Sequence, residues 1–246
     1  MIDHNRLKIL ELRVKLLEIC VICAKRGLNL QKQLICDISQ ELTLVLKRDI
    51  KYDFDKRIAT GSTLLVGEGN LSFTCALVRK VQHPNSIIAS VYEEYSELSD
   101  EAKQNVQILK DIKLQILYGL DGKKLHKTFS TLSLDTIIFQ FPHTGSRESI
   151  NGENPNYALA RDFLCSAFCV LKKEGVVLIT VVDSDYYDNM FKLEALAVLV
   201  GFKKPTKYNF NPLDYLGYEH TMTHQDESAL KDYNKFTTYE FKPCSN

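Results

Sequence analysis

The sequence lacks tryptophan, a net charge and any long hydrophobic run. Its 246 residues contain 31 basic and 31 acidic side chains, so no overall field draws the chain toward nucleic acid or a membrane surface. No apolar stretch approaches the ~20 residues that cross a bilayer, and the first residues are charged throughout, unlike a secretory signal. Composition alone therefore gives no support for a membrane protein or a uniformly basic nucleic-acid-binding module.

The seven cysteines are odd in number and scattered, which indicates reduced thiols rather than a disulfide framework. We expect an intracellular protein, cytoplasmic by default, with the nucleolus as an alternative in a eukaryote. Cys20 and Cys23 have the spacing of metal ligands but no second pair, so we predict no metal site. Cys165 and Cys169 lie one helical turn apart and are expected in the core.

The first fifty residues predict two helices. Apolar residues recur there at steps of three and four, as they do on one face of a helix, first around Val14 and again around Ile38. We expect residues 1–50 to form an antiparallel helical hairpin that either packs on the following domain or contacts a protein partner. Residues 51–62 are polar and are expected to form a linker.

From Thr63 onward, short apolar runs alternate with helical segments. The predicted strands are residues 63–67, 86–92, 114–119, 135–141, 175–182, 206–210 and 237–242. The predicted helices are residues 70–81, 95–110, 122–130, 154–173 and 186–200, with Gly175 and Gly201 expected as C-terminal caps. Continuous Val, Ile and Leu runs are typical of strands buried on both faces. Residues 63–246 are therefore predicted to be an α/β domain with a doubly wound, mostly parallel sheet.

The stretch LLVGEGNLSF, residues 64–73, links the first strand to a helix. Gly67 and Gly69 leave the backbone bare, so a ligand can approach closely. Asn70 is positioned to cap the helix, whose amides attract electronegative groups. The pattern indicates a nucleotide-like ligand, while a plain turn remains the alternative.

Polar residues also follow the other predicted strands. Glu93 and Glu94 follow the second strand, and Asp121 follows the third. The fourth strand runs into FQFPHTG and the fifth into VVDSDYY. Because ligands of doubly wound sheets bind at the carboxyl ends of the strands, these residues are expected to form one site.

The glycine pattern discriminates between nucleotides. A dinucleotide fingerprint requires a third glycine where this chain has Ser72, and no lysine follows to form a phosphate-binding P-loop. Acids after the next strands suit the adenosine of S-adenosylmethionine, which has no pyrophosphate. The alternatives are an NAD-dependent dehydrogenase and a Rossmann-fold binding module that has lost catalysis.

The motifs LLVGEGNLSF, FQFPHTG and YLGYEH, in this order, resemble the Rossmann-like methyltransferase family of the ribosomal RNA (uridine-N3)-methyltransferases. The resemblance covers about residues 62–224. It implies a seven-stranded class I methyltransferase fold, S-adenosylmethionine as cofactor and a base ring nitrogen in RNA as substrate, with uridine N3 the leading choice. The chain departs from the family pattern in lacking tryptophan and in having Leu216, Thr221 and Met222 where proline and basic residues are usual. The cofactor half of the pattern is thus kept, and the departures lie in the substrate half.

The motifs also assign roles to single residues. The expected cofactor contacts are Gly67, Glu68, Gly69, Asn70, Phe73, Glu93 and Asp121. In catalysis, His143 is expected to accept the proton of the ring nitrogen, while Gln140 binds a base carbonyl and Phe141 stacks on the base. The alternative for His143 is a purely structural hydrogen bond within its loop. The expected substrate contacts are Pro142, Arg147, Tyr186, Tyr187 and His220, with Arg147 expected to meet a phosphate. Residues 143–155 are expected to form either a substrate lid or a disordered loop.

Overall fold

The structure, a computed structural model, describes residues 14, 15, 18, 51–82, 84–146, 148–149, 152–220 and 233–244. The chain divides into two compact units, Met1–Lys51 and Tyr52–Asn246. In the first unit the described residues are all exposed; Val14, Lys15 and Glu18 are helical, whereas Lys51 forms an isolated bridge. The predicted hairpin otherwise lies outside the described residues, as does Arg147.

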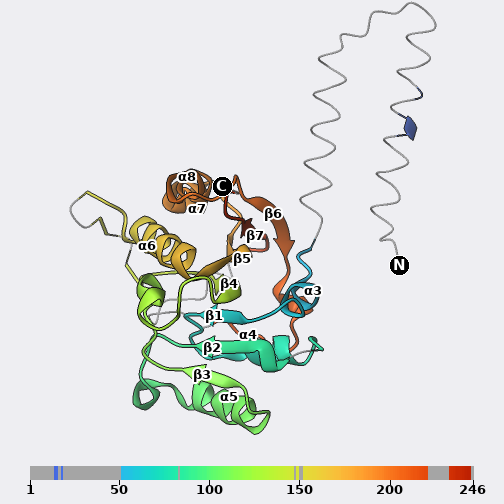
Figure 1. Cartoon of the computed structure of the whole chain (residues 1–246), viewed down its shortest axis with the longest axis vertical. Coiled ribbons are helices and arrows are strands. Elements are labelled where there is room, and N and C mark those ends of the chain that lie inside the picture. Colours follow the sequence, from blue (N-terminus) through green and yellow to red (C-terminus); the bar gives the residue numbers. More distant parts are fainter. Residues whose placement is uncertain are drawn as a thin grey trace, which may run out of the picture. The chain divides into compact units, whose positions relative to one another are not determined.

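Seven strands form one sheet in the order β3-β2-β1-β4-β5-β7-β6 (Figure 1). The strands are β1 Thr63–Val66, β2 Ile87–Ser90, β3 Gln115–Leu117, β4 Leu134–Gln140, β5 Leu171–Val182, β6 Thr206–Phe210 and β7 Phe236–Phe241. Strands β1 to β5 pair in parallel, whereas β7 lies antiparallel between β5 and β6. This topology confirms the predicted doubly wound, mostly parallel sheet of the Rossmann-like class I methyltransferase type.

Helices cover both faces of the sheet. The α-helices of the second unit are α3 Phe54–Ile58, α4 Ser72–Val78, α5 Asp100–Asp111, α6 Pro155–Val170, α7 Asp185–Phe191 and α8 Leu193–Val200. The 3-10 helices are η1 Pro84–Ser86, η2 Tyr95–Glu97, η3 Gly122–Lys127 and η4 Pro212–Asp214. Helix α4 contacts α5, while α6 contacts η3, α7 and α8. The right-handed connection from β1 through α4 to β2 and the one from β4 through α6 to β5 run toward opposite edges of the sheet. They therefore place these two groups of helices on opposite faces.

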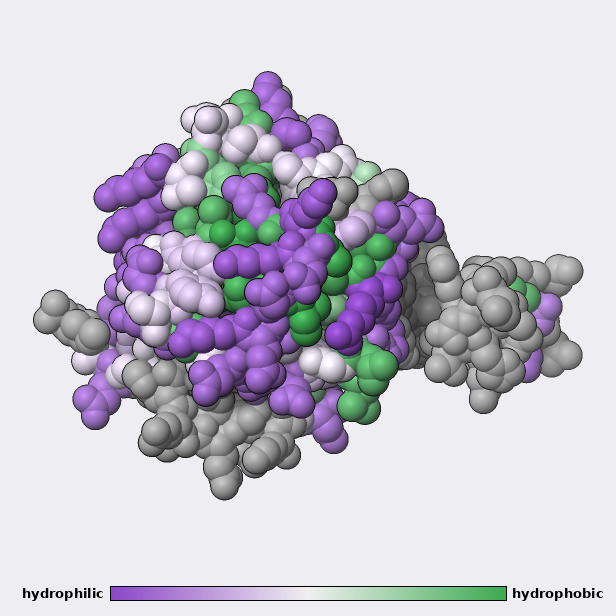
Figure 2. Space-filling view, turned by 90° about the horizontal axis from the view of Figure 1, so that it is seen from below, coloured by the Kyte–Doolittle hydropathy of each residue, from purple (hydrophilic) through white to green (hydrophobic). Residues whose placement is uncertain are grey.

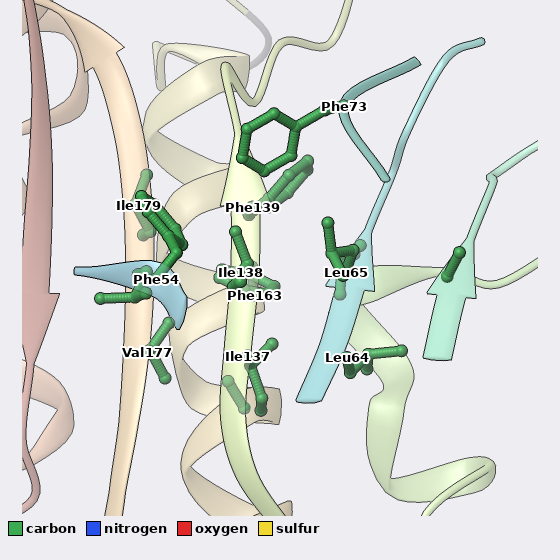
Figure 3. Close-up of a cluster of buried hydrophobic side chains, with 14 of the residues drawn as sticks. Phe54, Leu64, Leu65, Phe73, Ile137, Ile138, Phe139, Phe163, Val177 and Ile179 are labelled. Carbon is green, nitrogen blue, oxygen red and sulfur yellow. The ribbon is translucent and has the colours of Figure 1, made fainter. Parts of the chain in front are cut away.

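The core lies between the central strands and α6. Figure 3 shows buried side chains of β1, β4 and β5 aligned across the sheet, with Phe163 of α6 against them. The Phe139 and Phe163 rings meet edge to face at 4.9 Å. This apolar layer fixes the end of β4, where the polar motif FQFPHTG begins.

The segment 51–62, predicted to be a linker, contains α3. Its Phe54 and Ile58 are buried in the core, and Asp53 caps it by accepting a hydrogen bond from the Lys56 amide at 3.0 Å. Arg57 donates to Thr136 of β4 at 2.9 Å. These residues therefore form part of the α/β unit.

Three local expectations are corrected. Gly175 caps no helix, because α6 ends at Val170 and β5 begins at the next residue and includes Gly175. The helix predicted over 186–200 is two helices, since Lys192 adopts a left-handed φ of 49° between α7 and α8. Cys165 and Cys169 are exposed, because they lie on the outer side of α6. Gly201, with φ 105°, caps α8 as predicted.

Figure 2 shows the molecule from below, relative to the view of Figure 1. This face has hydrophilic residues with smaller hydrophobic areas between them. Among the described residues, no helix combines the length and apolar character of a membrane span. The described residues also contain no group of three or more His, Cys, Asp and Glu side chains that can hold a metal ion.

Candidate active site

The glycine-rich loop leaves β1 at the carboxyl edge of the sheet. Gly67 has φ +65°, and a Cβ added there would lie 2.8 Å from the Phe139 ring, so glycine is required. The Glu68 amide donates to the Ser90 carbonyl at 2.9 Å, which ties the loop to β2. Gly69 is exposed, so its backbone is open to a ligand.

The side chain of Glu68 turns into the protein. Its Oε2 accepts hydrogen bonds from the Thr74 amide at 3.1 Å and the Thr74 hydroxyl at 2.5 Å. Its Oε1 is buried without a partner. Burial raises the pKa of Glu68 to about 7, although the Thr74 hydrogen bonds oppose this shift. The loop therefore contains a carboxyl group that is partly protonated at neutral pH.

Asn70 organises the loop through all of its side-chain groups. Its Oδ1 accepts from the Ser72 amide at 3.0 Å, but the N-cap of α4 is Leu71, with φ 62° and no capping side chain, so Asn70 lies one residue before the cap position predicted for it. Its Nδ2 donates to Glu101 Oε1 at 2.9 Å and to the Glu219 carbonyl at 3.2 Å. The amide is thus engaged within the protein, and its place in the site is that of an anchor.

Two acids follow β2, and the structure separates them. The carboxylate of Glu94 belongs to a capping box with Glu97 at the start of η2. Glu93 makes no such bond with its side chain in the described structure, and it is partly exposed. Glu93 is therefore the acid of this pair that remains for the ribose hydroxyls of a nucleoside.

Asp121 follows β3 and begins η3. Its Oδ1 accepts from the Lys123 amide at 2.9 Å, and its Oδ2 lies 3.2 Å from the Lys124 ammonium. Burial raises its pKa, but the Lys123 hydrogen bond and Lys124 outweigh burial and leave the pKa below its ordinary value. Asp121 is therefore ionised and held in place.

The residues at these strand ends fit S-adenosylmethionine. β1, β2 and β3 are neighbours in parallel register, so their carboxyl ends share one edge of the sheet. The exposed backbone at Gly69 suits close approach, and Glu93 and Asp121 offer acceptors for the hydroxyl and amino groups of an adenosine. Phe73 is also expected to contact the cofactor. It is buried and packs on Phe210, Tyr215 and Tyr218 in an aromatic cluster.

The end of β4 holds a buried amide without partners. Both Oε1 and Nε2 of Gln140 are inaccessible and make no hydrogen bond in the described structure. Leaving such groups unpaired costs about 1–3 kcal/mol each. The next residue, Phe141, has a left-handed φ of 49°, which is strained for a phenylalanine. Its amide donates to the Thr180 carbonyl of β5 at 2.8 Å, which holds this conformation.

His143 lies just beyond this turn, after the buried Pro142. The Gly145 amide donates to Nδ1 of His143 at 2.9 Å. A neutral imidazole whose Nδ1 accepts carries its proton on Nε2. In this arrangement His143 offers a donor, not the acceptor that a general base requires.

His220 reaches the same region from the segment after η4. Its ring lies 4.9 Å from the Phe141 ring. Burial and the nearby His143 lower the pKa of His220 to about 4, so this imidazole is neutral at physiological pH. The structure thus brings together two histidines that are distant in sequence. Phe141 also packs on Phe210 and Phe236, so its ring supports His220 from the core.

Asn156, which the sequence analysis missed, anchors the segment after His143. Its Oδ1 accepts from the Thr144 amide at 2.9 Å, and its Nδ2 donates to the Ser146 carbonyl at 2.9 Å. Asn156 is fully buried on the first turn of α6. A sequence signal existed in NPN, residues 154–156, because Asn154 is the helix cap and the second asparagine has no capping role. The start of the predicted lid is therefore fixed.

The two tyrosines after β5 differ. Tyr187 is buried and stacks near Phe191, with ring centroids 6.3 Å apart, whereas Tyr186 is 50% exposed. Both belong to α7. Of this pair, Tyr186 has the surface that a base can contact.

Comparison with known proteins finds a match over the region that contains these motifs. The BMT5-like family model, described as rRNA (uridine-N3-)-methyltransferase BTM5-like, matches residues 64–222. The chain belongs to this family. Residues 64–222 therefore form a BMT5-like S-adenosylmethionine-dependent methyltransferase domain, and the resemblance stated from the three motifs is confirmed.

Curated relatives of this BMT5-like chain differ in length. Uncharacterized protein At4g26485 of Arabidopsis thaliana is 31% identical over 170 residues, which are 65% of this chain and 81% of that protein. Human ferredoxin-fold anticodon-binding domain-containing protein 1 is 30% identical over 172 residues, 64% of this chain but 27% of the human protein. The 25S rRNA (uridine(2634)-N(3))-methyltransferase of Saccharomyces cerevisiae is 22% identical, with 68% of each chain covered. The chain thus spans about a quarter of the human relative.

Proposed function

We propose that the protein transfers a methyl group from S-adenosylmethionine to a ring nitrogen of a base in RNA, with N3 of a uridine as the acceptor. The yeast relative, which is named for this reaction on ribosomal RNA, supports the choice. The observation that carries the proposal is the unpartnered carboxamide of Gln140, which lies three residues from His143 at the end of β4.

The chemistry of uracil matches the donors at this end of β4. N3 lies between two carbonyl groups, and loss of its proton spreads negative charge onto both oxygens. We assign the Nε2 amide of Gln140 to one carbonyl and the Nε2–H of His143 to the other. Donors placed where charge develops stabilise the transition state. Cytosine offers one carbonyl and an amino group beside N3, so the same two donors would fit it less well.

Bound S-adenosylmethionine supplies an electrophilic methyl group on a positively charged sulfur. Transfer of this group to the base would form the bond from N3 to the methyl carbon as the sulfur–carbon bond breaks, and the N3 proton would pass to solvent. Gln140 and His143 hold the base in line, so positioning is their main contribution to the rate. This role for His143 replaces the proton acceptor expected from the sequence.

The target base must be unpaired or flipped out of its helix. N3 of uracil is engaged in Watson–Crick pairing, so the base must leave its helix to reach Gln140. Because both polar atoms of Gln140 are inaccessible in this structure, the proposal also requires neighbouring side chains to move aside when the base enters. The exposed Tyr186 provides an aromatic face for such a base. Arg147, expected to contact a phosphate, lies outside the described residues and stays a prediction.

The experiment is incubation with radiolabelled S-adenosylmethionine and separate pools of RNA, protein and small metabolites. We expect label in RNA, and digestion to nucleosides should place it in 3-methyluridine. Label in another nucleoside would overturn the uridine assignment, and label in protein or metabolites alone would overturn the RNA assignment. No label in any pool would favour the binding module that has lost catalysis.

A further inference from the structure

Ser72 and the backbone of Glu219 form a reciprocal pair of hydrogen bonds. The Ser72 hydroxyl donates to the Glu219 carbonyl at 2.8 Å, and the Glu219 amide donates to the Ser72 oxygen at 3.0 Å. The two residues are 147 positions apart in the sequence. Ser72 is the first residue of α4, directly after the glycine-rich loop, and is buried. One buried hydroxyl therefore joins the cofactor loop to the YLGYEH motif.

Two further contacts support the same junction. Asn70 Nδ2 donates to the Glu219 carbonyl at 3.2 Å, and the Phe73 ring meets the Tyr218 ring edge to face at 5.2 Å. Of these contacts, the Ser72 pair satisfies both backbone groups of Glu219. Ser72 also occupies the position of the third glycine in a dinucleotide fingerprint. A glycine there would lack the hydroxyl and both hydrogen bonds.

The junction determines where His220 lies, because His220 follows Glu219 directly in the chain. Its ring is held 4.9 Å from the Phe141 ring, on the side of the site that we assign to the base. His143 lies close enough to influence its charge state. Fixing the Glu219 backbone thus fixes the start of this side chain.

We propose that Ser72 is a positioning residue, which holds His220 beside Phe141 and His143 and thereby couples the cofactor loop to the base-binding side of the site. The catalytic meaning of this coupling rests on the proposed function. The coupling itself is a property of the fold and can be tested without methyl transfer.

The test is the variant Ser72→Ala, followed by NMR titration of the histidine rings. In the wild-type protein, we expect the His220 ring to stay neutral down to a pKa of about 4, because it is partly buried and lies near His143. In the variant, we expect the pKa to rise toward the ordinary value of about 6.5 as the ring becomes hydrated. An unchanged His220 titration in a folded variant would overturn the proposal.

Two control variants match Ser72→Ala. Glu219→Ala changes the neighbouring residue but keeps the backbone contacts, since the Glu219 side chain is exposed, and should leave the His220 titration unchanged. Ser133→Ala removes a serine hydroxyl that donates to the Ser130 carbonyl at 2.7 Å, far from the junction in sequence, and should also leave it unchanged. A His220 shift in Ser133→Ala equal to that in Ser72→Ala would also overturn the proposal.

A measurement on the wild-type protein covers the case in which Ser72→Ala does not fold. The Glu219 amide should exchange with deuterium slowly, because it donates to a buried oxygen. Exchange at the rate of an unstructured amide would overturn the proposal. If the RNA assay is positive, Ser72→Ala should lower kcat by roughly 10- to 100-fold with an unchanged Kd for S-adenosylhomocysteine. If the RNA assay is negative but the His220 titration changes as expected, the proposed function is refuted and the positioning role of Ser72 stands.

Discussion

The backbone amide of Gly145 donates a hydrogen bond of 2.9 Å to Nδ1 of His143. This contact closes a short turn after the strained Phe141 and assigns the ring proton of the neutral histidine to Nε2. Because the adjoining Thr144 is held by the buried Asn156, the turn is supported from α6 as well. The histidine is therefore presented to the site as a donor.

A donor role for His143 predicts a specific pH profile. The rate of methyl transfer should keep rising above the ordinary histidine pKa of about 6.5, because it follows the ionisation of uracil N3 and not that of the imidazole. His143→Gln, which keeps a donor, should retain more activity than His143→Ala. Two results together would instead identify His143 as the base. The wild-type rate would level off near the ordinary histidine pKa of about 6.5, and the rise of the rate with pH would be lost in both variants.

Replacing Gln140 by leucine should separate stability from activity. The variant removes two buried groups without partners and keeps a similar volume, so we expect the free energy of unfolding to rise by about 2–6 kcal/mol, which is about 1–3 kcal/mol for each group. Methylation of RNA should be lost while S-adenosylhomocysteine still binds. Thermal melts, calorimetry and the radiolabel assay measure the three quantities, and the exposed Gln115→Leu is the control. Full activity in Gln140→Leu would remove Gln140 from the base site.

Glu93 and Glu94 should respond oppositely to alanine substitution. Glu93→Ala should weaken S-adenosylhomocysteine binding by about 10-fold or more, because a charged hydrogen bond to a ligand is worth about 1.5–3 kcal/mol. Glu94→Ala should leave the affinity near the wild-type value but lower stability by about 0.5–2 kcal/mol, since it removes a capping box. Calorimetry and chemical denaturation distinguish the two. Equal affinities in both variants would contradict the assignment of Glu93.

Glu68 predicts that stability falls as the pH rises. Its pKa is about 7 in the folded protein and about 4.5 in the unfolded chain, so between these values the folded state binds more protons. The free energy of unfolding then decreases with pH across this window, by about 3 kcal/mol at most. Glu68→Gln should therefore equal the wild type near pH 4 and exceed it at pH 8. Chemical denaturation at both pH values tests this, with the exposed Glu174→Gln as the control. A stability difference between Glu68→Gln and the wild type that is the same at both pH values would contradict the role of the Glu68 pKa.

The sequence predicted the features that depend on local pattern. Buried β-strands require continuous apolar runs, and a close backbone approach requires glycine, so β1, β4 and the loop at Gly67 could be identified. The break at Lys192 could not be predicted, because left-handed conformations are usually marked by glycine and this position is a lysine. The partners of Ser72 and the tautomer of His143 depend on residues that approach only in the folded chain.

The position of β7 has a consequence for how the protein is made. β6 is translated before β7, yet β7 lies between β5 and β6 and hydrogen-bonds to both. Until β7 has left the ribosome, β5 has an open edge and β6 has no neighbour in the sheet. The nascent domain must therefore hold an incomplete sheet during synthesis, and in this interval the open edge of β5 is available for mispairing.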